Sequence, residues 1–374
     1  MKLSILKENL LKGLNIVSKA TSKSITLPIL NNVLLSTEKN FLKISATDLE
    51  LGIQYWVLSK TEKEGSITIP AKFLTSLINL IPDEKINLET KGDTLFIKGK
   101  NYKNEVKGLS SEDFPVIPEV KDGQVLEVDS FKLTSGFSQI VNTASTSQTR
   151  PEISGVYIFL DKNIIEMAAT DSFRLAEKRV SMKSSLDKNI SLIILQKTIR
   201  EFISIFGEEQ GILKLYFSPN QIMFESFSKE VSHPKIRITS RLIDGEYPNY
   251  KEVIPSGFKT KIILNKKEFL NKIKAASLFS NKINEIVLDV DPEKNVVDIS
   301  SQNQDLGESK SQMKIKGEGE KVKTSFNYRF IIDGLSNIEG EKVALELNGE
   351  EGPGVLKPLE KEDFLYVVMP IKNN

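Results

Sequence analysis

The stretch LQKTIREFISIFGEEQGILKLYF at residues 195–217 holds a pattern that recurs along the chain. Its first half has apolar residues at helical spacing, a polar turn with glycine follows, and the alternation from Ile212 to Tyr216 predicts a strand. The same order recurs in PAKFLTSLINLIPDEKINLET at 70–90, where Pro70 suits the first helical position, and in NYRFIIDGLSNIEGEKVALELN at 327–348. The chain therefore contains three copies of one helix–turn–strand unit.

A further predicted helix and strand-like sequence precede each copy. The three helical segments are KENLLKGLNIVSKAT at 7–21, DSFKLTSGFSQIVNTAS at 129–145 and NKKEFLNKIKAASLFS at 265–280, the last with Asn265 as a candidate N-cap. Three units of the form helix, strands, helix, strands follow from this order. The predicted fold is α+β, with two helices packed on antiparallel sheet in each of three repeated domains.

Two segments rich in proline and charge mark the joints between the repeats. They are DFPVIPEVKDGQ at 113–124 and EYPNYKEVIPSG at 246–257. The predicted domains are 1–122 (N-terminal), 123–250 (central) and 251–374 (C-terminal), and three domains suit a chain of 374 residues.

The composition excludes several common classes of enzyme active site. The chain has no cysteine and one histidine, His233, so thiolate zinc sites, cysteine nucleophiles and two-histidine metal sites are absent. Neither a phosphate-binding Gly-Lys-Ser/Thr loop nor a Gly-x-Ser-x-Gly turn occurs, and DVDPEK at 289–294 lacks the glycine and distal glutamate of a calcium loop. We expect no catalytic residues, no metal and no cofactor.

The N-terminal segment does not have the uninterrupted apolar run of a signal peptide, because Lys7, Glu8 and Lys12 lie within it. No run approaches the roughly 20 apolar residues that span a bilayer. These two features predict a cytoplasmic protein.

The distribution of charge is more informative than its total. The 51 Lys and Arg nearly balance the 50 Asp and Glu. Lysines nevertheless gather on the predicted helices, with five in residues 1–24 against one acid and five in 265–282 against one acid. Lysine on a helix face commonly serves solubility alone. Its repetition on equivalent helices favours contact with a polyanion, and the absence of interleaved aromatic residues argues against stacking on single strands.

Short strings in order along the chain resemble one protein family, the bacterial DNA polymerase III beta subunits, which are replicative sliding clamps. They are LPILNNVLL at 27–35 with ATDLEL at 46–51, TRPEISGVYI at 149–158, ATDSFRLAEKR at 169–179, LIDGEYPNYKEVIP at 242–255, FNYRFIIDGL at 326–335 and YVVMPIK at 366–372. The resemblance covers essentially the whole chain in the right order.

The resemblance implies the DNA clamp fold and a ring-shaped, head-to-tail homodimer around double-stranded DNA. It implies sequence-independent DNA contact and processivity for the replicative polymerase, without catalysis. Partners are the replicative DNA polymerase, the clamp loader and repair proteins, which bind through clamp-binding peptides. The DNA-facing residues it suggests are Lys12, Lys19, Lys23, Lys132, Arg150, Lys197, Arg200, Lys266 and Lys272.

By the same resemblance, partner peptides bind in an apolar pocket between the second and third domains, where Arg174 would hold the peptide backbone or a carboxylate. The matching positions are Ile153, Thr170, Ser172, Phe173, Arg174, Leu175, Pro248, Val253, Asn327, Phe330, Met369, Pro370, Ile371 and Lys372.

This sequence departs from the family at several pocket positions. Ser172 and Phe173 replace a common Gly-His, Glu252 stands where a basic residue is frequent, and Phe330 stands where Tyr is frequent. The peptide preference is therefore expected to differ. Dimer contact is expected between the edge strand 102–108, with Tyr102 and Val106, and the third domain near Leu278 and Phe279.

Two other functions are compatible with the residues alone. A basic scaffold could bind nucleic acid without encircling it, and an α+β enzyme could use carboxylates that carry no known motif. The solution mass and retention on circular DNA separate these alternatives from a ring.

Overall fold

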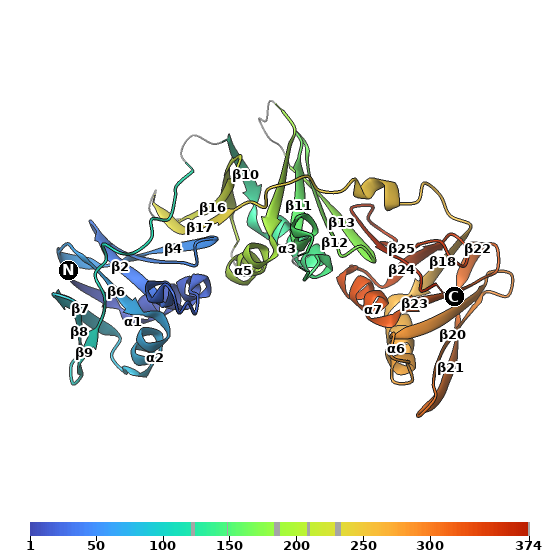
Figure 1. The fold of residues 1–374 in the computed structure, drawn as a ribbon, viewed down its shortest axis with the longest axis horizontal. Helices are drawn as coiled ribbons and strands as arrows, with labels where there is room; N and C mark the ends of the chain where they lie inside the picture. Colours follow the sequence, from blue (N-terminus) through green and yellow to red (C-terminus); the bar gives the residue numbers. More distant parts are fainter. Residues whose placement is uncertain (121–123, 148, 183–187, 208–209, 229–232, 373–374) are drawn as a thin grey trace. The chain divides into compact units, whose positions relative to one another are not determined.

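The computed structural model describes residues 1–120, 124–147, 149–182, 188–207, 210–228 and 233–372 (Figure 1). The chain forms two compact units. Unit one comprises Met1–Phe131 and Glu201–Leu242, and unit two comprises Lys132–Arg200 and Ile243–Asn374. The central repeat thus contributes strands to both units.

Unit one contains two antiparallel sheets. The larger has the order β10-β15-β16-β17-β4-β3-β2-β6, and the smaller has the order β5-β1-β7-β8-β9. Their bounds are β1 (Lys2–Leu6), β2 (Asn32–Glu38), β3 (Phe41–Thr47), β4 (Leu51–Leu58), β5 (Lys60–Lys63), β6 (Ser66–Pro70), β7 (Lys85–Lys91), β8 (Thr94–Lys98), β9 (Lys103–Lys107), β10 (Gln124–Asp129), β15 (Ile212–Ser218), β16 (Gln221–Phe227) and β17 (Pro234–Arg241).

Unit two also contains two antiparallel sheets, with the orders β14-β11-β12-β13-β26-β25-β24-β18-β22 and β21-β20-β19-β23. Their bounds are β11 (Gly155–Leu160), β12 (Ile164–Thr170), β13 (Arg174–Ser181), β14 (Ile190–Leu195), β18 (Thr260–Asn265), β19 (Glu285–Asp291), β20 (Val296–Asn303), β21 (Gly307–Lys314), β22 (Lys316–Gly319), β23 (Val322–Asn327), β24 (Lys342–Leu347), β25 (Gly354–Pro358) and β26 (Phe364–Val368).

The predicted helices form at the predicted places. They are α1 (Lys7–Val17), α2 (Ala71–Leu80), α3 (Ser130–Ile140), α5 (Gln196–Phe206), α6 (Lys266–Ser277) and α7 (Tyr328–Asn337), with a short α4 (Pro151–Ser154) and the 3-10 turns η1 (Ser18–Ala20), η2 (Pro28–Asn31), η3 (Val141–Thr143) and η4 (Tyr250–Val253). Helix α1 packs on α2, and α6 packs on α7. The α+β prediction, with two longer helices on antiparallel sheet in each repeat, is confirmed.

The apolar residues that recur at helical spacing form the face that each helix buries. In α1 the side chains of Leu10, Leu14 and Val17 have no exposed surface, and in α6 the same is true of Phe269 and Ile273. Burial of such side chains contributes roughly 1.5–3 kcal/mol each, which outweighs the modest helix propensity of segments this short.

Two local predictions at helix starts have different outcomes. Asn265 is the N-cap of α6, since its side-chain oxygen accepts from the Glu268 amide at 3.0 Å. Pro70 lies one residue earlier than predicted, as the last residue of β6, because it pairs with Asn32 before α2 begins at Ala71.

The predicted strand 212–216 is confirmed within β15. The turn before it includes residues 208 and 209, which lie outside the described residues. The predicted boundary between 122 and 123 also lies outside them, and the boundary between 250 and 251 falls within η4.

Strand pairs join neighbouring repeats edge to edge. In unit one β4, from the first repeat, pairs with β17, from the second, and we call this pair the first junction. In unit two β13 pairs with β26 from the third repeat, and we call this pair the second junction. The two large sheets therefore run across the repeat boundaries, which is why the two compact units do not coincide with the three repeats.

Candidate functional site

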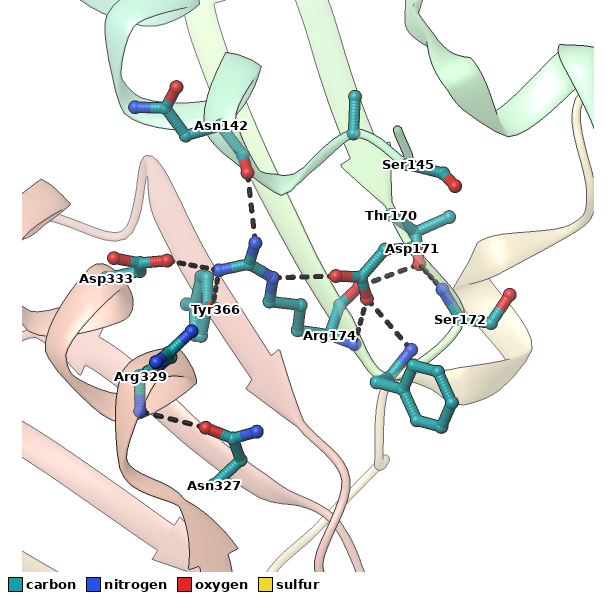
Figure 2. Close-up of polar contacts among 12 residues, drawn as sticks. Asn142, Ser145, Thr170, Asp171, Ser172, Arg174, Asn327, Arg329, Asp333 and Tyr366 are labelled. Carbon is teal, nitrogen blue, oxygen red and sulfur yellow. Dashed lines mark hydrogen bonds and ion pairs between the residues drawn. The ribbon is translucent and has the colours of Figure 1, made fainter. Parts of the chain in front are cut away.

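The turn between β12 and β13 in unit two is the centre of the candidate site. The Asp171 Oδ1 atom accepts from the amides of Phe173 and Arg174, both at 3.0 Å, and Thr170 Oγ1 accepts from the Ser172 amide at 3.1 Å (Figure 2). Side-chain acceptors thus replace the backbone partners that a three-residue loop lacks. The result is a fixed turn that exposes Ser172 and Phe173.

Ser172 adopts a left-handed backbone conformation with a φ of 77°. Glycine takes this conformation without the steric cost that a Cβ atom adds. The glycine common in the resembling family is therefore explained by this turn, and serine is accommodated at some cost in stability. Its Oγ atom lies 3.2 Å from the Arg150 guanidinium, which donates to it.

Arg174 links the turn to the third repeat. Its Nε donates to Asp171 at 2.9 Å, one terminal nitrogen donates to Asp333 of α7 and to the Tyr366 hydroxyl, and the other donates to the Asn142 carbonyl at 3.1 Å (Figure 2). Burial alone would lower the pKa of this guanidinium, but Tyr366, Asp171 and Asp333 outweigh that effect and raise it.

Four of the five guanidinium N–H groups of Arg174 are therefore already used. Its plane also lies 4.6 Å from the centre of the Phe330 ring. Arg174 therefore holds the cavity wall to α7 while it also lines the cavity, and its role in binding a peptide stays a prediction.

A cavity of about 230 Å³ opens beside this turn, entirely within unit two. Its lining brings together residues from the turn, the joint after residue 245, β26 and α4. They are Arg150, Ile153, Thr170, Ser172, Arg174, Leu175, Pro248, Asn249, Tyr250, Val253, Val367 and Met369. The lining is mainly apolar with a few polar groups at one side, which suits an apolar side chain of a ligand.

The remaining predicted pocket residues lie around the cavity without lining it. Phe173 is 62% exposed on the turn, and its carbonyl accepts from the Met369 amide at 2.8 Å. Asn327 caps α7, Phe330 stacks under Arg174, and the other three follow β26: Pro370, Ile371 and Lys372. The Ile371 amide donates to the Ser325 carbonyl at 2.8 Å, which fixes this terminal segment.

Four lining residues were not predicted for the pocket. Asn249, Tyr250 and Val367 belong to strings quoted for the resemblance, and alternation along β26 would have placed Val367 beside Met369 on one face. Arg150, predicted to face DNA, lines this cavity, with its Nε 3.2 Å from Glu152.

Tyr250 forms the floor of the cavity and rests on two carboxyl groups. Its hydroxyl lies 2.7 Å from Glu166 Oε1 and 2.9 Å from Glu177 Oε2, and both acids are more than nine-tenths buried. A phenol has one hydrogen to donate. The hydroxyl can donate this hydrogen to either carboxylate, so the two acids compete for it.

The surroundings shift the pKa values of the two acids in opposite directions. Burial and the charge of Glu166 raise the pKa of Glu177. Burial by itself would raise the pKa of Glu166. Hydrogen bonds from Lys251, at 2.7 Å, and from Tyr250 outweigh burial and lower this pKa. Glu166 is thus the charged partner, and Glu177 is the one that retains a proton more readily.

Family models match the chain in three consecutive parts. The N-terminal domain of the DNA polymerase III beta subunit matches residues 1–118, the central domain matches 127–249, and the C-terminal domain matches 251–372. The chain belongs to the DNA polymerase III beta subunit family. The resemblance found in the sequence is confirmed.

Relatives match over the full length of the chain. The beta sliding clamp of Synechococcus elongatus is 28% identical over 380 residues, which cover 100% of this chain and 99% of that protein. The crystal structure of the Bacillus subtilis sliding clamp matches with a TM-score of 0.94 at 25% identity, covering 100% of both chains. That of the Thermotoga maritima beta subunit matches with 0.91 at 26% identity, again over 100% of both chains. This chain has the three-domain clamp fold of that family.

The basic residues predicted to face DNA differ in their surroundings. Exposed side chains on or near helices are Lys12, Lys23, Lys132, Lys197 and Arg200. Lys19 donates to Ser204 at 2.5 Å and lies 3.6 Å from Glu201, and Lys272 lies 3.7 Å from Glu268.

Lys266 is a helix cap in this beta subunit. Its Nζ donates to the Ile338 carbonyl at the end of α7, at 2.7 Å, and Lys7 donates to the Ile81 carbonyl at the end of α2, at 2.9 Å. Both lysines satisfy a carbonyl that the helix leaves unpaired. Because Lys7 and Lys266 make equivalent contacts in two repeats, a structural role for Lys266 is supported. The charge pattern of the sequence could not distinguish this role from a DNA contact.

No cluster of three or more metal-ligating side chains occurs among the described residues. No described helix is long and apolar enough to cross a membrane.

We expect Glu166→Gln, but not Glu177→Gln, to lower the stability near pH 7. Glu166, with its lowered pKa, stabilises the fold above its unfolded pKa, so its replacement costs about 1–3 kcal/mol near pH 7, and the cost falls as the pH drops toward 4. Glu177, with its raised pKa, stabilises the fold at low pH and less as the pH rises, so its replacement is neutral or stabilising near pH 7. Urea unfolding from pH 4 to 8 measures both. Equal losses at pH 7 would contradict the assignment.

Proposed function

We propose that this chain is the subunit of a sliding clamp that closes head-to-tail around duplex DNA and tethers a DNA polymerase. One observation carries the ring: the strand pairing that joins neighbouring repeats stops at β9 in the first repeat and at β21 in the third. Membership of the beta subunit family, with relatives named beta sliding clamps, supports the activity.

Each junction joins four strands of one repeat to the last strands of the next. At the first, β6-β2-β3-β4 meets β17-β16-β15-β10, and at the second, β14-β11-β12-β13 meets β26-β25-β24-β18. The third repeat has the equivalent first half, β23-β19-β20-β21, and the first repeat has the equivalent second half, β9-β8-β7-β1. Among the described strands β21 pairs with β20 alone and β9 with β8 alone.

A third junction between β21 of one copy and β9 of another would complete the pattern. The amides of Gly99 and Gly108 bond across the β8–β9 hairpin, so alternation directs the Asn104 and Val106 amides toward β8 and the Glu105 amide toward the free edge. An unpaired edge of this kind favours strand addition. Of the predicted contact residues, Tyr102 is 44% exposed beside β9, and Leu278, at the end of α6, is 71% exposed with Phe279 after it. Val106 is only 5% exposed, so its side chain belongs to the core, and β9 would contribute its backbone at that position.

Weak, sequence-independent DNA contact is the expected task of the exposed basic residues near the helices. Contact with phosphate requires positive charge at tolerant spacing and gives no base readout. The net charge of +1 excludes strong overall attraction, which suits a ring that is held by topology and slides.

The cavity beside Arg174 is the proposed site for peptides of the polymerase, the clamp loader and repair proteins. Its apolar lining and the fixed turn support an apolar peptide anchor. The domain division at 1–122, 123–250 and 251–374 is part of this proposal, as is a purely non-catalytic role in the cytoplasm. The separate family-model matches support the division.

Retention on circular DNA tests the ring. We expect loaded protein to stay on closed circular DNA and to leave after linearisation. Replacement of Lys12, Lys132 and Lys197 by Glu should lower retention severalfold at low salt and less at high salt, because exposed charges are screened. Equal loss from circular and linear DNA would favour a scaffold that binds without encirclement, and turnover of a nucleotide would favour an enzyme.

A proline on the free edge tests the dimer. Glu105→Pro removes an amide that faces away from β8, so we expect it to weaken the dimer at least tenfold while the monomer stays folded. Glu105→Ala, which keeps the amide, is the matched control. Analytical ultracentrifugation measures the mass against 42.0 kDa for one chain. A dimer of unchanged affinity in the proline variant would remove β9 from the interface.

Met369→Ala tests the peptide site, because Met369 lines the cavity. We expect a polymerase C-terminal peptide to bind this variant about tenfold or more weakly, with an unchanged dimer. Phe173→Ala is the control, since Phe173 is exposed and lies outside the lining. Fluorescence polarisation measures both affinities. A larger loss in the Phe173 variant would show that the exposed turn, and not the cavity, binds the peptide.

A further inference from the structure

The joint that forms part of the unit-two cavity has a counterpart in unit one. DFPVIPEV at 113–120 aligns without a gap to EYPNYKEV at 246–253. The aligned aromatic residues Phe114 and Tyr247 are each 8% exposed, and Ile117 aligns with the floor residue Tyr250. Both joints therefore attach to their units through the same aromatic position.

The turn that each joint contacts is duplicated as well. Asp48 Oδ1 accepts from the amides of Glu50 and Leu51 at 3.0 and 2.7 Å, and Thr47 Oγ1 accepts from the Leu49 amide at 3.0 Å. This is the bonding pattern of the turn at Asp171. Leu49 has a φ of 79°, matching the 77° of Ser172.

A second cavity, of about 430 Å³, lies beside this turn and entirely within unit one. Its lining is drawn from the turn, the joint and the end of β17: Thr47, Leu49, Glu50, Gly52, Val116, Ile117, Pro118, Gln221, Thr239, Ser240 and Arg241. Strand pairing sets the correspondence, since Gly52 pairs with Thr239 as Leu175 pairs with Val367. Arg241, two residues after Thr239, therefore takes the place of Met369.

The chemistry of the second cavity differs from that of the first. Ile117 packs closely on Gly52, because a Cβ atom at Gly52 would lie 2.6 Å from its Cγ2. The rim carries two exposed apolar side chains, Leu49 at 45% and Val116 at 90%. A ligand would therefore meet exposed apolar surface at Leu49 and Val116.

The side chains of Arg241 and Thr239 in the lining each have a polar group without a partner among the described residues. The exposed Arg241 guanidinium has no hydrogen bond or ion pair there, although its backbone amide donates to the Glu50 carbonyl at 2.9 Å. The Thr239 hydroxyl is also unpartnered, in a residue only 4% exposed. An unpaired guanidinium is a site for a carboxylate. Glu50 is the one acid of the lining, so an occupant with a single carboxylate fits better than a strongly acidic one.

We propose that the unit-one cavity is a second peptide site, which takes a short segment carrying an apolar side chain next to one carboxylate. The apolar side chain contacts Leu49 and Val116, and the carboxylate pairs with Arg241. This site requires neither the ring nor the unit-two cavity, so it extends the proposed function and does not depend on it.

Fluorescence polarisation with a labelled Ser-Gly-Leu-Asp-Leu-Gly amide peptide and the full chain tests the proposal. We expect saturable binding that weakens about tenfold when Asn replaces the Asp of the peptide, and by a similar factor in Arg241→Gln. Leu49→Asn should weaken it severalfold and keep the fold, because asparagine tolerates a positive φ. Circular dichroism checks the fold of each variant.

Met369→Ala is the control that separates the two cavities. It should leave binding of this peptide unchanged, whereas the polymerase peptide should respond to Met369→Ala and not to Arg241→Gln. Absent binding, unchanged binding in Arg241→Gln, or loss in Met369→Ala would each overturn the second site. None of these outcomes bears on the polymerase peptide, whose behaviour tests the proposed function separately.

Discussion

Antiparallel pairing between strands of different repeats is the constraint on which the rest of this structure depends. An unpaired strand edge exposes a row of amides and carbonyls, and pairing satisfies them. The pairs of β4 with β17 and of β13 with β26 build the two large sheets across repeat boundaries. The joints, the turns and both cavities lie beside these pairs, so the positions of the candidate sites follow from the junctions.

The two junctions share a scaffold and differ in the side chains on it. The duplicated Thr-Asp turn and the aromatic joint position are kept. Leu175 and Met369 give the unit-two cavity an apolar interior, whereas in the unit-one cavity Ile117 packs closely on Gly52 and Arg241 gives a charged edge. Duplication of a backbone arrangement thus leaves each copy free to acquire its own ligand chemistry.

The position of the candidate site could be predicted from the sequence better than the contacts of its individual residues. The turn at 170–174 and the end of β26 could be identified because short strings carry them. The contact of Arg174 with α7 could not, because its partner Asp333 lies 159 positions away and pairs with it only in the folded unit. Lys266 shows the same limit: its charge suggested DNA, but the fold directs its ammonium to the end of α7.

By itself the sequence determined the three repeats, the α+β class, the helices and the family, because periodicity, breakers and motifs are local properties of the chain. The tertiary structure alone decided which strands pair across repeats, which strands lie at the sheet edges, and which side chains share a cavity. It also decided that Tyr250 lies between Glu166 and Glu177, with one acid favouring its charge and the other its proton. The physical reason is that strand pairing and burial bring together groups far apart in sequence, and their hydrogen bonds and pKa values depend on that proximity.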